Sequence, residues 1–262
     1  MTSNTPRSAL GVPPRRPRHI PQSAGFCRLF RHRRDMGWLP AALLILMATC
    51  ALPARGQHQT IICEGSAPQS IRPQPHVEIF RGLGGYMPGS EGLQERLAAH
   101  GISSTTSCNV SAHCVARRIL ERRAQGDQSP IVLMGYAVGG GGTRKVAKDL
   151  AEHGVCVDAV ILIDPSFFEP VPRNVRYCFV AYKPEIWNYW NPIQLGHPVR
   201  VESTGTVVNR MNLDDTAPPG VLRGECHLTI TTNDWIQELL VHQAAAVFGL
   251  DGDEPQCSSP PR

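Results

Sequence analysis

The chain has 262 residues, of which 42% are hydrophobic and 18% charged, and its formal net charge is +4 at pH 7. A chain of this length and apolar content can bury its own core without a metal ion or a disulfide, and its composition excludes disorder along the whole length. The charge is unevenly divided: residues 1–56 carry 9 basic and 1 acidic side chains, whereas residues 57–262 carry 17 basic and 21 acidic ones, a net −4. Because the body is mildly acidic, we expect no nucleic-acid-binding domain and no nucleic-acid partner.

Residues 1–56 have the pattern of an export signal. The basic stretch Arg31-His32-Arg33-Arg34 precedes an uncharged, mostly apolar run over residues 36–54, and small residues then precede Gln57. This order is typical of a secretory signal peptide, and we expect cleavage before Gln57 and a periplasmic or secreted protein. The alternative is a membrane anchor over residues 36–54, although a span needs roughly 20 apolar residues. An uncleaved segment would be the only membrane contact that the sequence predicts.

The remaining chain divides into a linker or edge segment at residues 57–75, an α/β domain at 76–250 and a disordered tail at 251–262. Seven cysteines follow residue 56, an odd number that cannot pair completely within the chain. Cys108 and Cys114 are the nearest pair and the bridge that the sequence favours, whereas Cys156 and Cys178 lie in apolar surroundings typical of buried free thiols. Histidine and cysteine show no zinc-ligand spacing, so we expect no metal and no cofactor.

Strand and helix patterns alternate from residue 76 onward. We expect strands at 76–81, 102–107, 130–135, 157–164 and 176–182, and helices at 89–100, 111–126, 143–153 and 234–248. Ser111 is the expected N-terminal cap of the second helix. The run PIVLMG is continuously apolar, as strands buried on both faces are, and VDAVILID is expected to be the next buried strand. The alternation predicts a three-layer α/β/α fold with a mostly parallel sheet, whose ligand site lies at the carboxyl ends of the strands.

The predicted strand–turn–helix at 130–150 contains Gly135-Tyr136-Ala137-Val138-Gly139. It resembles the G-x-S-x-G nucleophile elbow of the α/β-hydrolase family, at its lipase, esterase and thioesterase end, and the resemblance covers roughly residues 75–248. The buried strand before it, the helix after it and the two outer glycines match that pattern. The residue at the nucleophile position, however, is Ala137 instead of serine.

The resemblance also implies an acid and a histidine after the elbow, in that order. Asp164 ends the next strand, and His227 precedes the last helix. Asp214 and Asp215 are alternative acids. An Asp-Pro turn and a single histidine are also common without catalysis, so a purely structural role for Asp164 and His227 stays open.

The same resemblance implies an oxyanion hole made by backbone N–H groups of Val138 and of the loop containing Leu83 and Gly84. Tyr136, Trp187 and Trp190 are candidates for contact with an apolar ligand, although aromatic side chains in a long loop also pack onto a core. A phosphate-binding loop is disfavoured, because GYAVGGGGTRK has neither the GxxxxGK[ST] nor the GxGxxG spacing.

Because alanine has no hydroxyl group, it cannot form an acyl-enzyme. The leading hypothesis is therefore an exported α/β-hydrolase-like protein of impaired catalysis, a pseudoenzyme that binds a small acyl or apolar ligand or a partner. The alternatives are an active ester or thioester hydrolase with a non-standard nucleophile, and a non-enzymatic surface interaction protein.

Overall fold

The computed structural model describes residues 74–166, 169–184 and 196–250. The predicted signal or anchor segment, nearly all of the linker, the tail at 251–262, and Trp187 and Trp190 lie outside these ranges. Within the ranges, no helix combines the length and the apolar character that a membrane crossing requires.

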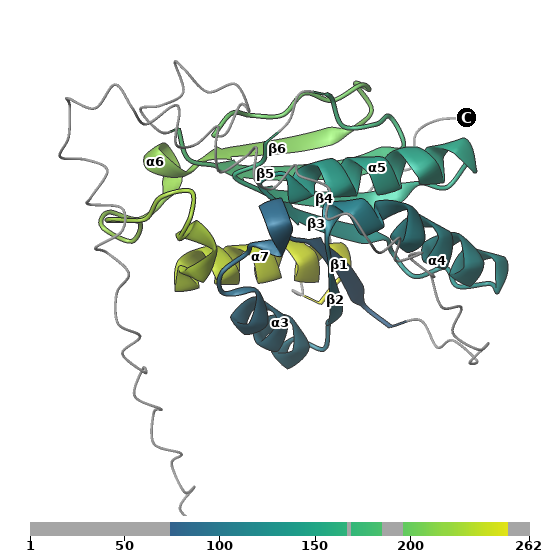
Figure 1. Cartoon of the computed structure of the whole chain (residues 1–262), viewed down its shortest axis with the longest axis horizontal. Coiled ribbons are helices and arrows are strands. Elements are labelled where there is room, and N and C mark those ends of the chain that lie inside the picture. Colours follow the sequence, from purple (N-terminus) through teal and green to yellow (C-terminus); the bar gives the residue numbers. More distant parts are fainter. Residues whose placement is uncertain (1–73, 167–168, 185–195, 251–262) are drawn as a thin grey trace, which may run out of the picture.

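The centre of the fold is one six-stranded sheet with the order β2-β1-β3-β4-β5-β6, and every neighbouring pair is parallel (Figure 1). The strands are β1 (His76–Phe80), β2 (Ser103–Ser107), β3 (Val132–Tyr136), β4 (Val157–Ile163), β5 (Val175–Tyr182) and β6 (Val207–Asn212). The strands expected from the sequence agree with β1 to β5 within two residues at each end. β6 was not identified, because it lies at the sheet edge, is largely exposed, and lacks the apolar run of a buried strand.

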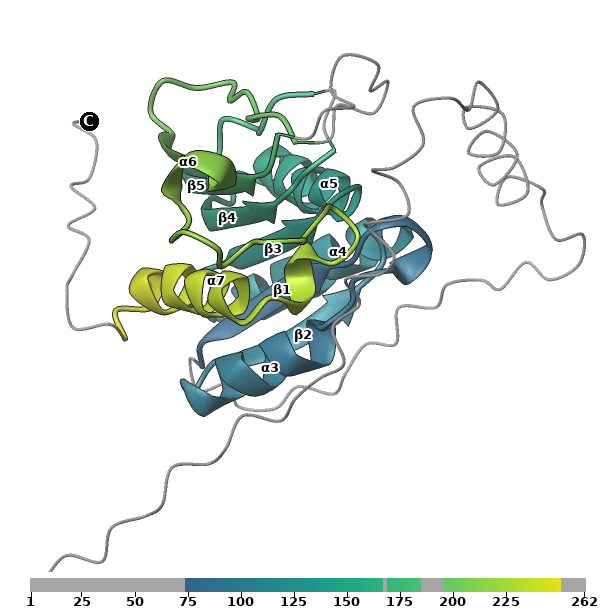
Figure 2. The ribbon, with the colours of Figure 1, turned by 90° about the vertical axis from the view of Figure 1, so that its left-hand side faces the viewer.

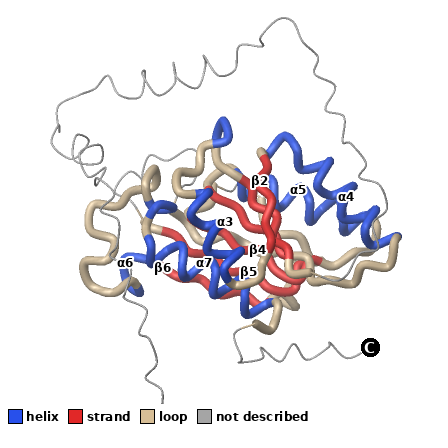
Figure 3. Tube along the Cα trace, turned by 90° about the horizontal axis from the view of Figure 1, so that it is seen from below, coloured by secondary structure: helices blue, strands red, loops and turns tan. Residues whose placement is uncertain are grey.

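Within the described residues, the helices of ten or more residues cover both faces of the sheet (Figure 2; Figure 3). α3 (Ser90–Ala99) and α7 (Asp234–Val247) pack with one core cluster, and α4 (Ala112–Ala124) and α5 (Gly139–Glu152) pack with the other. The shorter helices are η1 (Leu83–Gly85), η2 (Asn109–Ser111), α6 (Leu213–Thr216) and η4 (Ile230–Thr232). The predicted three-layer α/β/α fold is therefore confirmed, with a sheet that is parallel throughout.

Strand alternation explains how the sheet fills both cores. In β3, Val132, Met134 and Tyr136 pack toward α3 and α7, whereas Leu133 packs toward α4 and α5. All five residues of β3 are buried. A central strand covered on both faces needs apolar side chains at odd and even positions alike, which is why its sequence shows no polar alternation.

Two details of the helices differ from expectation. α5 begins at Gly139, four residues before the expected start, because its first turn is made of glycines that pack closely on β1 and β3. Ser111 occupies the N-cap position of α4 as predicted, but its side chain makes no capping hydrogen bond there. By contrast, Asn233 caps α7, since its side chain accepts hydrogen bonds from the N–H groups of Trp235 and Ile236.

The cysteines also differ from expectation. Cys108 is a free thiol while Cys114 is disulfide-bonded, so the predicted Cys108–Cys114 bridge was wrong. Cys226 is also disulfide-bonded. Cys178 is free and buried as expected, and burial raises the pKa of its thiol to about 12. Cys156 is free but exposed, because it lies in the turn that leads into β4.

Candidate active site

Ala137 lies in a strained turn between β3 and α5. Its φ angle is 52°, in the left-handed region that side-chain-bearing residues rarely occupy. This conformation costs on the order of 1–2 kcal/mol for a residue with a Cβ atom. The turn is supported from both sides, because the N–H of Ala137 donates to the carbonyl of Ile163 and its carbonyl accepts from the N–H of Gly140, at 3.2 and 3.1 Å. The backbone thus has the sharp strand-to-helix turn that the resemblance implied.

Close packing requires the two outer glycines of the motif. A Cβ atom on Gly139 would lie 2.2 Å from the carbonyl oxygen of Phe80 and 2.6 Å from that of Arg81. On Gly135 it would lie 2.8 Å from the Cα of Gly140. Strand β1, strand β3 and the start of α5 therefore approach one another to a distance that only glycine permits, which fixes the elbow in place.

Asp164 and His227 meet beside this turn. Nδ1 of His227 lies 2.6 Å from Oδ2 of Asp164, and the second carboxylate oxygen accepts a hydrogen bond from the backbone N–H of Lys183 at 3.2 Å. Asp164 is 1% exposed and has a φ angle of 44°, a second left-handed residue at the carboxyl end of the sheet. An ionised carboxylate only accepts hydrogen bonds, so this contact with the ionised form of Asp164 requires the proton on Nδ1 of His227. The carboxylate therefore orients the imidazole ring, as an acid–histidine pair does in acyl transfer.

The two alternative acids are engaged elsewhere. Asp214 pairs with the ammonium group of Lys183 at 3.2 Å, and Asp215 accepts from the amide of Asn212 at 2.6 Å. Both lie in the short helix α6. Asp164 is thus the acid that the fold brings to His227.

Tyr136 was expected to contact a ligand, and in the structure its side chain packs against His227. Its side chain is 1% exposed, its ring stacks on His227 with centroids 5.1 Å apart, and its hydroxyl donates to the carbonyl of His227 at 2.5 Å. Tyr136 therefore supports the histidine from beneath. The sequence carried a signal for this, because strand alternation places Tyr136 on the same core-facing side as Val132 and Met134.

The predicted oxyanion donors lie in two neighbouring segments. Leu83 and Gly84 belong to η1, which directly follows the point where β1 packs on Gly139. Val138 precedes the first turn of α5, and its N–H donates to no backbone oxygen among the described residues. The loop after β1 also contacts the loop that contains His227, because the hydroxyl of Tyr86 donates a hydrogen bond to the carbonyl of Leu228 at 2.8 Å. The loop after β1 and the histidine loop are therefore tied together, a contact that the sequence did not reveal.

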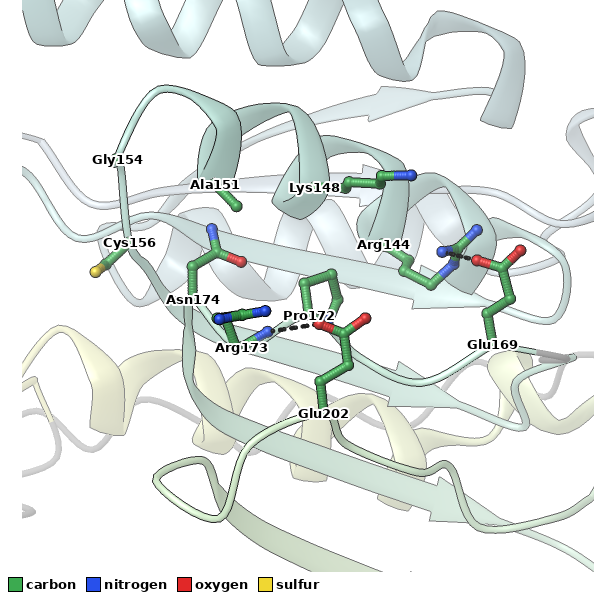
Figure 4. A pocket seen from close by; sticks show the side chains of 10 residues that line it. All are labelled: Arg144, Lys148, Ala151, Gly154, Cys156, Glu169, Pro172, Arg173, Asn174 and Glu202. Atoms are coloured by element: carbon green, nitrogen blue, oxygen red, sulfur yellow. Dashed lines mark hydrogen bonds and ion pairs between the residues drawn. The ribbon is translucent and has the colours of Figure 1, made fainter.

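A hollow of about 550 Å³ lies away from this site, along α5 and the loop before β5 (Figure 4). Half of the residues that line it are charged; Arg144 pairs with Glu169, and Glu202 accepts a hydrogen bond from the backbone N–H of Arg173. In the part of the chain that the structure describes, no group of three or more His, Cys, Asp or Glu side chains could hold a metal ion.

Comparison by sequence finds no matching protein-family model and no matching curated protein. Among solved structures, the chain is similar to lipase B of Aspergillus fumigatus, with 15% identity and a TM-score of 0.49 over 66% of this chain and 52% of that one. The chain thus spans about half the length of that lipase. It is also similar to an arylesterase, with 11% identity and a TM-score of 0.45 over 68% of this chain and 77% of that one. A third similar structure is the RedJ thioesterase of the prodiginine pathway in Streptomyces coelicolor, with 14% identity and a TM-score of 0.41 over 72% and 93% of the two chains.

Proposed function

We propose that this α/β-hydrolase-like chain is an exported protein that binds an acyl or other apolar ligand at the elbow without hydrolysing it. The observation that supports the proposal is that alanine occupies the nucleophile position of the turn. Ala137 has the backbone conformation of a nucleophile elbow, and Asp164 and His227 are paired beside it, but its side chain ends at Cβ. A site that keeps its acid, its histidine and its backbone donors can still bind a carbonyl compound.

The expected loss of turnover follows from the chemistry of acyl transfer. The serine hydroxyl attacks the carbonyl carbon, and the histidine removes its proton. Without the nucleophile the pair has nothing to activate, and only backbone donors and ligand binding still contribute, roughly a 10³–10⁴-fold acceleration over water.

A second candidate is an active hydrolase in which His227 activates a water molecule in place of the missing hydroxyl group. The intact hydrogen bond between Asp164 and His227 favours it, because an oriented imidazole is what a general base requires.

Substitution of Ala137 by serine separates the two candidates. We expect Ala137→Ser to hydrolyse p-nitrophenyl esters or acyl thioesters of short or medium chain roughly 10³-fold faster than the unmodified protein. Ala137→Gly is the matched control, because it also changes the strained position but adds no hydroxyl group, and it should stay inactive. Ala137→Ser with His227→Ala should lose the gained activity.

Two results would contradict the proposal. Turnover of the unmodified protein equal to that of Ala137→Ser would favour the water-activating hydrolase. A folded Ala137→Ser variant without turnover on any of these substrates would show that Asp164 and His227 do not complete a triad.

The export part of the proposal has separate support. Cys114 and Cys226 are disulfide-bonded, and disulfides persist mainly in oxidising compartments outside the cytosol. Intact-mass measurement of the protein recovered from its native cells tests export, and we expect a mature chain that begins at Gln57. Retention of Arg31 to Arg34 in that protein would overturn this assignment.

A further inference from the structure

Within the described ranges, Arg81 is a half-buried cation that has no carboxylate partner. Its Nε atom is completely buried and has no hydrogen-bond partner. Its Nη2 atom contacts the thiol of Cys108 at 3.9 Å, and a thiol is only a weak acceptor. Among the described residues, no acidic side chain lies within ion-pair distance of this guanidinium.

The other half-buried arginines of the described ranges are all compensated. Arg96, Arg122 and Arg144 each pair with a carboxylate. Arg123 donates to the carbonyl oxygens of Asp127 and Ser129 at 2.6 and 2.7 Å. Arg81 alone among them has a thiol as its only contact. The lack of a charged or carbonyl partner for Arg81 therefore needs an explanation in its surroundings.

The position of Arg81 supplies that reason. The residue follows β1 and directly precedes the loop of η1, and its own carbonyl packs against Gly139 at the elbow. Its guanidinium lies against that loop, since a Cβ atom on Gly85 would be 3.8 Å from both Cζ and Nη2. The 14-residue helix α5 begins at the same edge of the sheet, and its N-terminus adds positive potential there. Asp164, the acid of the candidate site, is already bonded to His227.

Partial burial of an unpaired guanidinium raises the free energy of the folded protein, and an anion that binds to the guanidinium lowers it again. We propose that Arg81 binds an anionic group, a carboxylate or a phosphate, on the ligand that occupies the elbow site. The inference rests on the proposed function and narrows the ligand class to negatively charged acyl compounds. Arginine suits this task because its planar donors match both anions in a bidentate manner.

Calorimetric titration of the purified protein with three eight-carbon compounds tests the inference. Octanoate and octyl phosphate carry the two anionic groups, and octanamide has the same chain without a charge. We expect both anions, or the one that matches the natural ligand, to bind roughly tenfold or more tightly than octanamide. This preference should disappear in Arg81→Gln and return at least partly in Arg81→Lys, which keeps the charge.

Arg173→Gln is the matched control, because Arg173 is an exposed cation of the charged hollow along α5. It should leave the preference for anions unchanged. If octanamide and the anions bind equally well to the unmodified protein, the role of Arg81 is overturned while ligand binding at the elbow stands. If no compound binds, the proposed function itself fails. Thermal unfolding of each variant verifies folding, and Arg81→Lys keeps the test decisive if Arg81→Gln does not fold.

Discussion

A single methyl group added to Gly139 should damage the elbow, although it changes nothing in the chemistry of the site. The new Cβ atom would lie 2.2 Å from the carbonyl oxygen of Phe80, the last residue of β1, and 2.6 Å from that of Arg81, and neither the strand nor the helix can yield without moving a central element. Overpacking of a tight core usually costs about 1–3 kcal/mol, and a clash with backbone on both sides belongs at or above the upper end. We therefore expect Gly139→Ala to lower the free energy of unfolding by about 3 kcal/mol or more.

Gly141→Ala is the matched control in the same helical turn. There the added Cβ atom would meet only the side-chain amide of Asn109 at 3.5 Å, an ordinary contact. Since alanine favours a helix over glycine by about 0.5–1 kcal/mol, Gly141→Ala should be neutral or slightly stabilising. Urea denaturation of both variants under identical conditions measures the difference. Equal stability of the two variants would refute the close packing of β1 on α5.

Two further predictions concern side chains of the same sheet. Tyr136→Phe should lower the free energy of unfolding by about 1–2 kcal/mol, because it removes the hydroxyl that donates to the carbonyl of His227; unchanged urea denaturation would show that this bond adds nothing. Burial raises the pKa of Glu78, but hydrogen bonding by His76 and the charge of Arg118 outweigh it, and the pKa is lowered from 4.5. Because the pKa of Glu78 is lower in the folded protein than in the unfolded chain, its ionised carboxylate stabilises the fold above the unfolded value, and this stabilisation is lost as the pH falls below that value. Glu78→Gln should therefore flatten the acid-side decline of the unfolding free energy, and an equally steep decline in this variant would contradict the assignment.

The strands and helices that were predicted correctly are those whose apolar residues indicate which of their faces are buried. β3 is buried at every position, β4 is apolar except at Asp158, and α7 has an apolar face, so a two-sided sheet with covering helices followed directly. β6 was missed because its stability comes from pairing with β5 and not from its own side chains. The early start of α5 was missed because glycine disfavours a helix locally, and here tertiary packing overrides that preference.

The candidate site was predictable in its residues but not in its contacts. The resemblance to the α/β-hydrolase family placed Ala137, Asp164 and His227 in one expected site, and the structure places Asp164 against His227. The stacking of Tyr136 under the histidine and the uncompensated charge of Arg81 depend on side-chain directions at the ends of strands. Sequence periodicity describes such ends poorly, because the chain there leaves the regular alternation of the strand.

The turns that carry Ala137 and Asp164 are bonded to each other in both directions. The N–H of Ala137 donates to the carbonyl of Ile163, and the N–H of Ser166 donates back to the carbonyl of Ala137, at 3.2 and 3.1 Å. The head of the elbow and the acid therefore move as one rigid body, anchored on two adjacent central strands. The loop after β1 is joined to the segment that follows His227 by hydrogen bonds from the hydroxyl of Tyr86 to the carbonyl of Leu228 and from the hydroxyl of Thr231 to the carbonyl of Pro88, at 2.8 and 2.7 Å. We therefore expect any widening of the site to begin in these loops, with the acid and the elbow held still.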